Sequence, residues 1–217
     1  IATGFRNPYD LALSDQGDLF TYDSDNERDI GTPWYRPTRI CHVVSGGEFG
    51  WRTGTGKWPA YQPDSLPPAV DIGPGSPTGI TFGYGTQFPE KYQRALFVSD
   101  WSFGNLYAVH LAPQGASYEG TFEPFVTAAP LPVTDCVVRP QDGMLYFTVG
   151  GRGVESALYR IWYPGDGGQK IDGPKPAAPP LGELRRRLEA RHQPGSEAGD
   201  AEQIVTEVWP YLAHPDR

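Results

Sequence analysis

The sequence is poor in cysteine, and this shortage excludes several kinds of site. Its 217 residues include only Cys41 and Cys136, and no CxxC or CxxCH motif occurs. A zinc knuckle or an attached c-type haem within these residues is therefore excluded. The two thiols could form a disulfide, but two separate small buried residues are the simpler interpretation.

Long apolar runs and excess positive charge are also lacking. No apolar stretch approaches the roughly 20 residues of a transmembrane helix, so we expect no membrane span in this chain. Lys and Arg total 18 against 26 Asp and Glu, which gives a net charge of −8. Because an acidic surface repels phosphate backbones, we expect no nucleic-acid partner.

Glycine, proline and aromatic residues are abundant instead. There are 27 Gly and 23 Pro, and aromatics make up 13% of the chain. This composition is typical of many turns between short strands and favours an all-β fold. Pairs of apolar runs joined by a turn recur three times, and each predicts a hairpin. The pairs are Tyr9–Leu13 with Asp18–Tyr22, Thr78–Phe82 with Ala95–Ser99, and Asp135–Val138 with Met144–Val149.

These repeats predict about three blades of a β-propeller in residues 1–163, with an irregular β-sandwich as the structural alternative. Since propellers have about four to eight blades, we expect further blades to precede residue 1. Residues 164–180 are rich in Pro and Gly and predict a linker. In residues 181–217, apolar residues at helical spacing predict two short helices that begin an incomplete helical-repeat domain.

Strand direction predicts which residues share one edge of the blades. In each hairpin the first strand leaves this edge and the second returns to it. Loops that converge at a propeller rim are the default binding site. We therefore expect one common rim to carry Arg6, Asn7, Thr78, Trp101, Asp135 and Arg152.

One segment makes the interpretation more specific. The run from Gly4 to Ala12, followed by Gly17-Asp18-Leu19-Phe20, resembles a motif of soluble quinoprotein sugar dehydrogenases of the glucose/sorbosone type. Gly47-Glu48-Phe49-Gly50-Trp51 is similar to a second motif of that family. The resemblance implies a six-bladed propeller that holds pyrroloquinoline quinone (PQQ) and calcium.

A closer resemblance is to the large planctomycete-type "membrane-bound dehydrogenase" proteins. It rests on residues 29–39, Gly54–Pro59 and Pro210–Arg217. It implies that HEAT-like helices and a c-type cytochrome domain follow the propeller, and that the protein is periplasmic or extracellular. The histidine expected as the catalytic base would lie in blades before residue 1.

The resemblance also implies which residues hold the cofactor, and here the chain departs from the family. Arg6, Asn7, Thr78, Trp101 and Arg152 are the candidate cofactor-binding residues. However, Tyr9 stands where the family has a glutamine. The family's lysine is missing from residues 100–104, and its arginine pair is missing from Pro132-Val133-Thr134. Anionic PQQ requires cationic partners. Among the candidate cofactor-binding residues, these are Arg6 and Arg152.

The loop after Tyr22 carries several closely spaced acidic residues. Asp23, Asp25 and Asp29 are candidate ligands for Ca²⁺, which prefers oxygen donors. Alternatively, Arg28, Arg36 and Arg39 balance these charges and no metal binds.

The function we favour is oxidation of a sugar or polyol, with PQQ passing electrons to a haem domain outside this chain. A non-catalytic propeller that binds carbohydrate or protein partners on the same rim is the alternative. A propeller glycoside hydrolase or lactonase is the third possibility, with Glu48, Asp100 and Asp135 as its available carboxylates.

Overall fold

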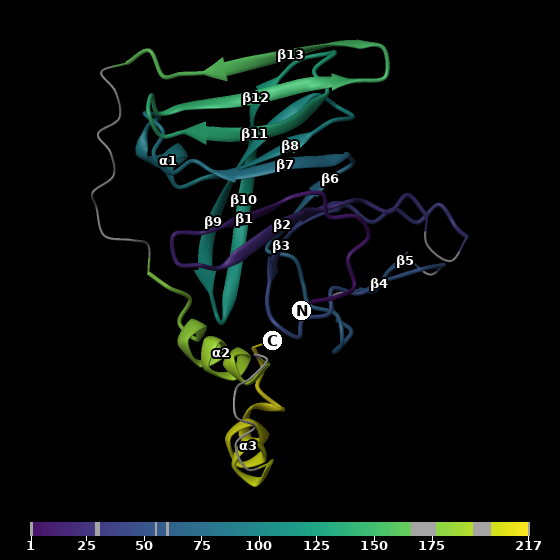
Figure 1. Ribbon diagram of the computed structural model, residues 1–217. Coiled ribbons are helices and arrows are strands. Elements are labelled where there is room, and N and C mark those ends of the chain that lie inside the picture. The colour runs from purple at the N-terminus through teal and green to yellow at the C-terminus, as the bar shows by residue number, and fades with distance from the viewer. Residues whose placement is uncertain are drawn as a thin grey trace.

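The computed structural model describes residues 2–28, 31–54, 56–59, 61–165, 177–192 and 201–216. Its main body is a set of antiparallel sheets stacked face to face, with two short helices beyond one end of the stack (Figure 1). The chain thus has the predicted all-β fold, a partial β-propeller of three blades with a short helical segment.

The first blade has four strands in the order β1-β2-β3-β6. They are β1 (Leu11–Leu13), β2 (Leu19–Asp23), β3 (Thr38–Val43) and β6 (Val70–Gly73). Ala12 faces Phe20 across the first hairpin, as its turn chemistry predicts. Between β3 and β6 the chain forms a small separate hairpin of β4 (Trp51–Arg52) and β5 (Gly56–Lys57).

The second blade is again four-stranded, in the order β7-β8-β9-β10. Its strands are β7 (Pro77–Phe82), β8 (Leu96–Asp100), β9 (Asn105–Gln114) and β10 (Ser117–Thr127), and α1 (Glu90–Gln93) lies in the long connection after β7. The third blade contains β11 (Val133–Arg139), β12 (Met144–Gly151) and β13 (Val154–Ile161). The other two predicted hairpins are therefore confirmed, and all three lie in separate sheets.

The first strands of the blades, β1, β7 and β11, lie next to one another and connect the sheets. The amide of Ile80 donates to Asp10 Oδ2 (3.1 Å), and Thr78 Oγ1 donates to the carbonyl of Val133 (2.7 Å). A Cβ on Gly79 would lie 2.5 Å from Asp135 Oδ1, so only glycine allows this approach. Apolar clusters fill both interfaces, around Phe20, Ile80 and Leu96 in one and around Phe97, Val133 and Leu145 in the other.

The two cysteines lie apart in the core as free thiols. Burial raises the pKa of each to about 12, so neither is a thiolate at neutral pH. The simpler interpretation of the cysteines is confirmed.

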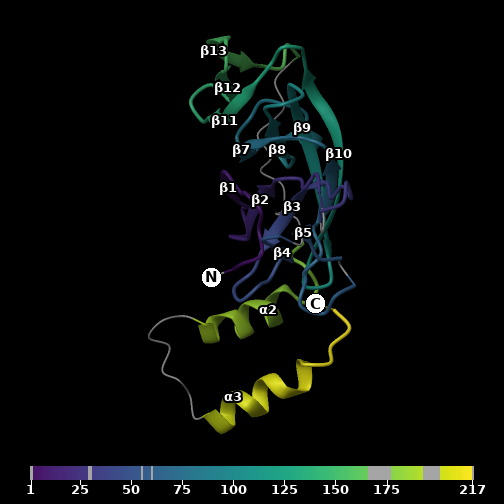
Figure 2. The same ribbon diagram turned by 90° about the vertical axis from the view of Figure 1, so that its right-hand side faces the viewer.

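The helical segment lies outside the sheets, as predicted (Figure 2). It contains α2 (Gly182–Glu189) and α3 (Ala201–Val208), each followed by a short 3₁₀ turn. Most of the expected linker, residues 166–176, lies outside the described residues, and the division into 1–163, 164–180 and 181–217 stays a prediction. Within the described ranges, no helix is both long and apolar enough to cross a membrane.

Helix α2 is anchored to the end of the blades opposite the rim. Arg185 Nη2 donates to Asp18 Oδ1 (2.6 Å), and Arg185 Nη1 donates to His42 Nε2 (2.5 Å). On its other side, Asp18 accepts a hydrogen bond from Tyr118 of β10 (2.5 Å). The amide of Leu181 donates to the carbonyl of Gly115 in the β9–β10 turn (2.9 Å). This polar cluster joins α2 to two blades, a contact that the sequence did not predict.

His42 makes this anchor sensitive to acid. Burial lowers its pKa below the ordinary 6.5, and nearby Arg185 adds to this effect against the opposing influence of Asp18. Unfolded chains therefore take up a proton on His42 at a higher pH than folded chains do. The stability that neutral His42 provides is complete above pH 6.5 and is lost as the pH falls through the folded-state pKa.

We expect the free energy of unfolding to fall between pH 7 and pH 5 more steeply in the natural protein than in a His42→Gln variant. Urea titrations at several pH values measure this difference. Raised carboxyl pKa values elsewhere are common to both proteins and cancel in the comparison. Parallel pH profiles would contradict the assignment.

Candidate functional site

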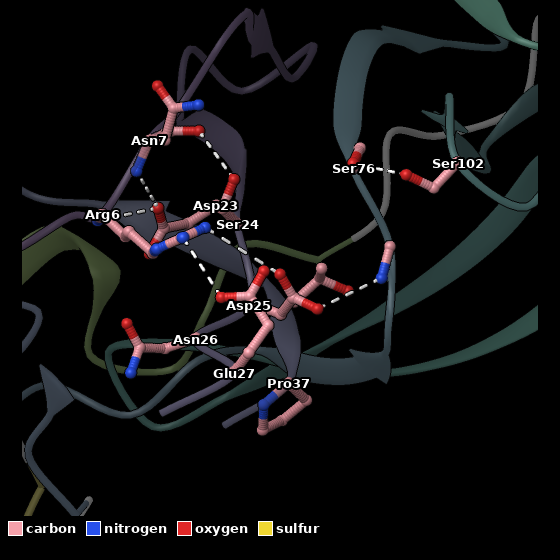
Figure 3. A network of polar contacts seen from close by, with 12 residues as sticks. Arg6, Asn7, Asp23, Ser24, Asp25, Asn26, Glu27, Pro37, Ser76 and Ser102 are labelled. Atoms are coloured by element: carbon pink, nitrogen blue, oxygen red, sulfur yellow. Dashed lines mark hydrogen bonds and ion pairs between the residues drawn. The ribbon is translucent and has the colours of Figure 1, made fainter. Parts of the chain in front are cut away.

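The rim is the edge at which β1, β7 and β11 begin and β2, β8 and β12 end, and it carries the candidate residues. Its loops contact one another in series. Asp25, in the loop after β2, accepts a hydrogen bond from the amide of Gly75 before β7 (3.4 Å). Ser76 Oγ then lies 2.6 Å from Ser102 Oγ in the loop after β8 (Figure 3). Trp101 Nε1 donates to the carbonyl of Gly150 at the end of β12 (2.8 Å). The three blades thus form one continuous rim.

Two aspartates at equivalent positions organise the loops that enter the blades. Asp23 is the last residue of β2, and its Oδ1 accepts the amides of Arg6 and Asn7 at 2.9 Å each (Figure 3). Asp100 is the last residue of β8, and it accepts the amide of Ser76 at 2.7 Å. Each carboxylate therefore holds in place the segment that leads into the neighbouring first strand of a blade. Because the two aspartates occupy equivalent positions in two blades, we assign both a structural role.

The charge of Asp23 is balanced by cations from neighbouring strands. Its carboxylate is fully buried, and its Oδ2 accepts Nε and Nη2 of Arg39 at 3.1 and 3.0 Å. Lys57 Nζ, also buried, lies 3.7 Å from the same oxygen. Burial and the nearby Arg39 charge lower the pKa of Lys57 to about 8, which still leaves it mostly protonated at neutral pH. Arg39, one of the three arginines expected as partners of the acidic loop, thus pairs with Asp23.

Arg6 is also engaged with carboxylates. Its guanidinium lies 3.2 Å from Glu27 Oε2 and 3.9 Å from Asp25 Oδ1. Burial raises the pKa of Asp25, and the weak hydrogen bond from Gly75 and the Arg6 charge only partly offset this. Arg6 therefore compensates the acidic loop, so its charge is partly neutralised before any ligand arrives.

The other candidate residues divide into packed and exposed groups. Thr78 and Trp101 form hydrogen bonds between the second and third blades: the Thr78 hydroxyl donates to the carbonyl of Val133, and the Trp101 indole N–H donates to the carbonyl of Gly150. The Trp101 ring also lies against Gly151, where a Cβ would stand 3.2 Å from the indole. In contrast, the side chains of Asn7 and Arg152 are exposed. Arg152 occupies the tight turn between β12 and β13 with a φ of 24°.

A pocket of about 210 Å³ opens on the rim between the second and third blades. Its walls come from the loop after β8, from the segment before β11 and from the β12–β13 turn. Phe103 is exposed there, with 56% of its surface accessible. Among the described residues that line this pocket, Arg152 carries the one positive charge. The lining residues are Trp101, Ser102, Phe103, Gly104, Ala128, Ala129, Pro130, Leu131, Pro132, Arg152 and Val154.

The expected calcium ligands are only partly visible. Asp29 lies outside the described residues, and the carboxylates of Asp23 and Asp25 face the Arg and Lys partners given above. Within the described part of the chain, no three His, Cys, Asp or Glu side chains are arranged to hold a metal. The calcium site stays a prediction. In the structure, Arg39, Lys57 and Arg6 already balance the charges of Asp23 and Asp25.

The carboxylates considered for hydrolysis are engaged in local hydrogen bonds. Glu48 accepts from Arg52 (2.6 Å), Asp100 accepts three backbone amides, and Asp135 accepts the amide of Cys136. None of these contacts forms an acid–base pair around a cleft, so this geometry gives no support to a glycosidase or lactonase.

Sequence reasoning missed Phe103 and Lys57. Phe103 comes two residues after Trp101 in the predicted rim loop, so its position was an available signal. Lys57 gave no signal, because an isolated lysine beside Trp58 looks like an ordinary surface residue.

The fold and the rim identify this chain as part of a β-propeller, and solved structures share this fold. A putative oxidoreductase (glucose dehydrogenase) from Thermus thermophilus matches 73% of this chain and 46% of its own, with 20% identity and a TM-score of 0.56. The PQQ-bound aldose sugar dehydrogenase of Streptomyces coelicolor matches 73% and 44%, with 15% identity and a TM-score of 0.53.

The apo-form of the soluble aldose sugar dehydrogenase from Escherichia coli matches 67% of this chain and 42% of its own, with 18% identity and a TM-score of 0.52. The chain thus spans less than half the length of each of these proteins. No protein-family description and no curated protein matches it. At these identities the likeness establishes the fold alone.

Proposed function

We propose that the rim pocket between the second and third blades binds a sugar or polyol, and that the complete propeller oxidises it. The observation that carries this proposal is the pocket itself. It combines an exposed aromatic ring, Phe103, with a guanidinium, Arg152, on the rim of a sugar-dehydrogenase fold. Aromatic faces pack against the apolar faces of sugar rings, and guanidinium groups donate to hydroxyl oxygens.

The size of the pocket supports a small ligand. At about 210 Å³ it is below the range of roughly 300–1,000 Å³ that is usual for drug-sized molecules. A single sugar ring or a short polyol suits this volume better than an oligosaccharide does.

PQQ fits the described residues poorly. This group carries several carboxylates and requires cationic partners. Arg6 faces Asp25 and Glu27, while Arg39 and Lys57 face Asp23. Of the candidate cofactor residues, Thr78 and Trp101 are committed to contacts between blades. We therefore derive no catalytic step through PQQ from these blades.

Calorimetric titration of the intact protein with a panel of monosaccharides and polyols tests the proposed site. We expect Phe103→Ala and Arg152→Ala each to weaken binding of the best ligand about tenfold, which corresponds to ~1.4 kcal/mol. Trp162→Ala is the matched control, because this exposed aromatic residue follows β13 at its opposite end. Equal affinity in all four proteins would refute the pocket assignment.

The second candidate is a propeller that binds carbohydrate or protein partners without catalysis. The pairing of Arg6 with Asp25 and Glu27 favours it, since it removes a cation from the rim. Dye reduction by the intact protein with sugar and added PQQ separates the two candidates. Reduction supports the dehydrogenase, and sugar binding without reduction supports the non-catalytic propeller.

The dehydrogenase proposal extends to the location of the protein and to its further domains. We propose a periplasmic or extracellular location and electron transfer to a c-type cytochrome domain elsewhere in the protein, with HEAT-like helices continuing from α2 and α3. Heme staining of the intact protein, and its distribution between periplasmic and cytoplasmic fractions, would test this.

A further inference from the structure

Lys57 is a buried amine beneath the rim, and the proposed function makes no use of it. It comes from β5, in the small hairpin between β3 and β6, and 4% of its side chain is exposed. A lysine is almost never buried unless its ammonium group is paired. Its partners therefore indicate what it does.

The ammonium group of Lys57 contacts three oxygens of the acidic loop. Nζ donates to the carbonyl of Ser24 and to the carbonyl of Pro37 (3.0 Å), and it lies 3.7 Å from Asp23 Oδ2. Ser24 follows β2, and Pro37 precedes β3. Lys57 thus joins the two ends of the connection between these strands.

Two carbonyls and a carboxylate around one positive charge form an oxygen-rich environment of the kind that a hard cation prefers. Acidic residues in this loop led to the expectation of calcium. We propose that the Lys57 ammonium is the resident cation of this loop, taking the place of a metal ion, so that the rim forms without calcium.

The position of Lys57 links this role to the rest of the rim. The connection that it closes carries Asp25 and Glu27, the two partners of Arg6, while Asp23 fixes the amides of Arg6 and Asn7. Loss of the ammonium would leave Asp23 with Arg39 as its charged partner and would release the carbonyls of Ser24 and Pro37. Lys57 is therefore a positioning residue. This inference does not depend on whether the pocket binds sugar.

Thermal unfolding of the intact protein at pH 7 tests the proposal. We expect the same Tm with calcium chloride and with EDTA, because the Lys57 ammonium already occupies this loop and leaves calcium no site in it. Lys57→Ala should lower the Tm by roughly 5–10 °C, and calcium or methylammonium should restore part of that loss by occupying the vacated space. Lys91→Ala, which removes an exposed amine, should change the Tm little.

Lys57→Met keeps the packing of the side-chain stem and removes the charge. Its Tm should be below that of the natural protein and should not respond to either cation, because the longer side chain fills the space. It also keeps the proposal testable if Lys57→Ala does not fold. A Tm of the natural protein that rises with calcium and falls with EDTA would overturn the proposal. So would a folded Lys57→Ala protein that responds to neither cation.

Discussion

Replacing Arg39 with alanine should lower the free energy of unfolding by about 3–5 kcal/mol. The reason is the fully buried Asp23 carboxylate, to which Arg39 donates from two nitrogens at 3.0 and 3.1 Å. Without the guanidinium, that charge stays buried with Lys57 3.7 Å away. Because Asp23 also fixes the amides of Arg6 and Asn7, the rim loses order along with stability. Urea unfolding followed by tryptophan fluorescence measures the change.

Arg160→Ala is the control for this effect, since Arg160 is exposed on β13 and its removal should change stability by less than about 0.5 kcal/mol. In the Arg39→Ala background, Asp23→Asn should restore part of the loss, because it removes the uncompensated charge. A loss below about 1 kcal/mol in Arg39→Ala would mean that the pair is open to water and does not organise the rim.

Replacing Arg185 with alanine should produce a loss of similar size, about 3–5 kcal/mol, at the opposite end of the blades. The side chain is nine-tenths buried, and it is the shortest charged contact of buried Asp18. Burial raises the pKa of Asp18, but nearby His42, the hydrogen bond from Tyr118 and the Arg185 charge outweigh this and hold the pKa below its usual range. Without Arg185, the buried Asp18 carboxylate would lose much of what stabilises its charge. We also expect α2 to separate from the blades, and proteases then to cleave near residue 181 faster.

Arg187→Ala on the same helix is the matched control. Its partner is Glu207, and the Arg187 side chain is 55% exposed, so less than about 1 kcal/mol should be lost. If Arg185→Ala and Arg187→Ala were equally stable and equally resistant to protease, α2 would not be anchored through Asp18.

The hairpins were predictable from sequence because their signals are local. Gln16-Gly17 and Asp142-Gly143 stand between alternating apolar residues, and both form the expected turns. Strand β10 was missed, although it is the longest. It is an outer strand with mostly half-exposed residues, and Gly120 and Pro124 interrupt its pattern, so neither burial nor alternation marks it.

For the rim, the sequence predicted which residues lie at the same edge of the blades. Strand direction places Arg6, Thr78 and Trp101 near one edge, and the contacts between the loops agree with this. The sequence offered Arg28, Arg36 and Arg39 as partners for the acidic loop, but it could not show that Arg39 pairs with Asp23, because this depends on the register of β2 against β3. The anchoring of α2 joins Arg185 to Asp18, 167 positions apart, which no local pattern can indicate.

A crystal structure of the intact protein with its best-binding sugar or polyol would locate the binding site. We expect the ligand in the pocket between the second and third blades, with a ring or carbon chain against Phe103 and a hydroxyl within hydrogen-bond distance of Arg152. A ligand bound elsewhere on the propeller, with this pocket holding only water, would contradict this expectation.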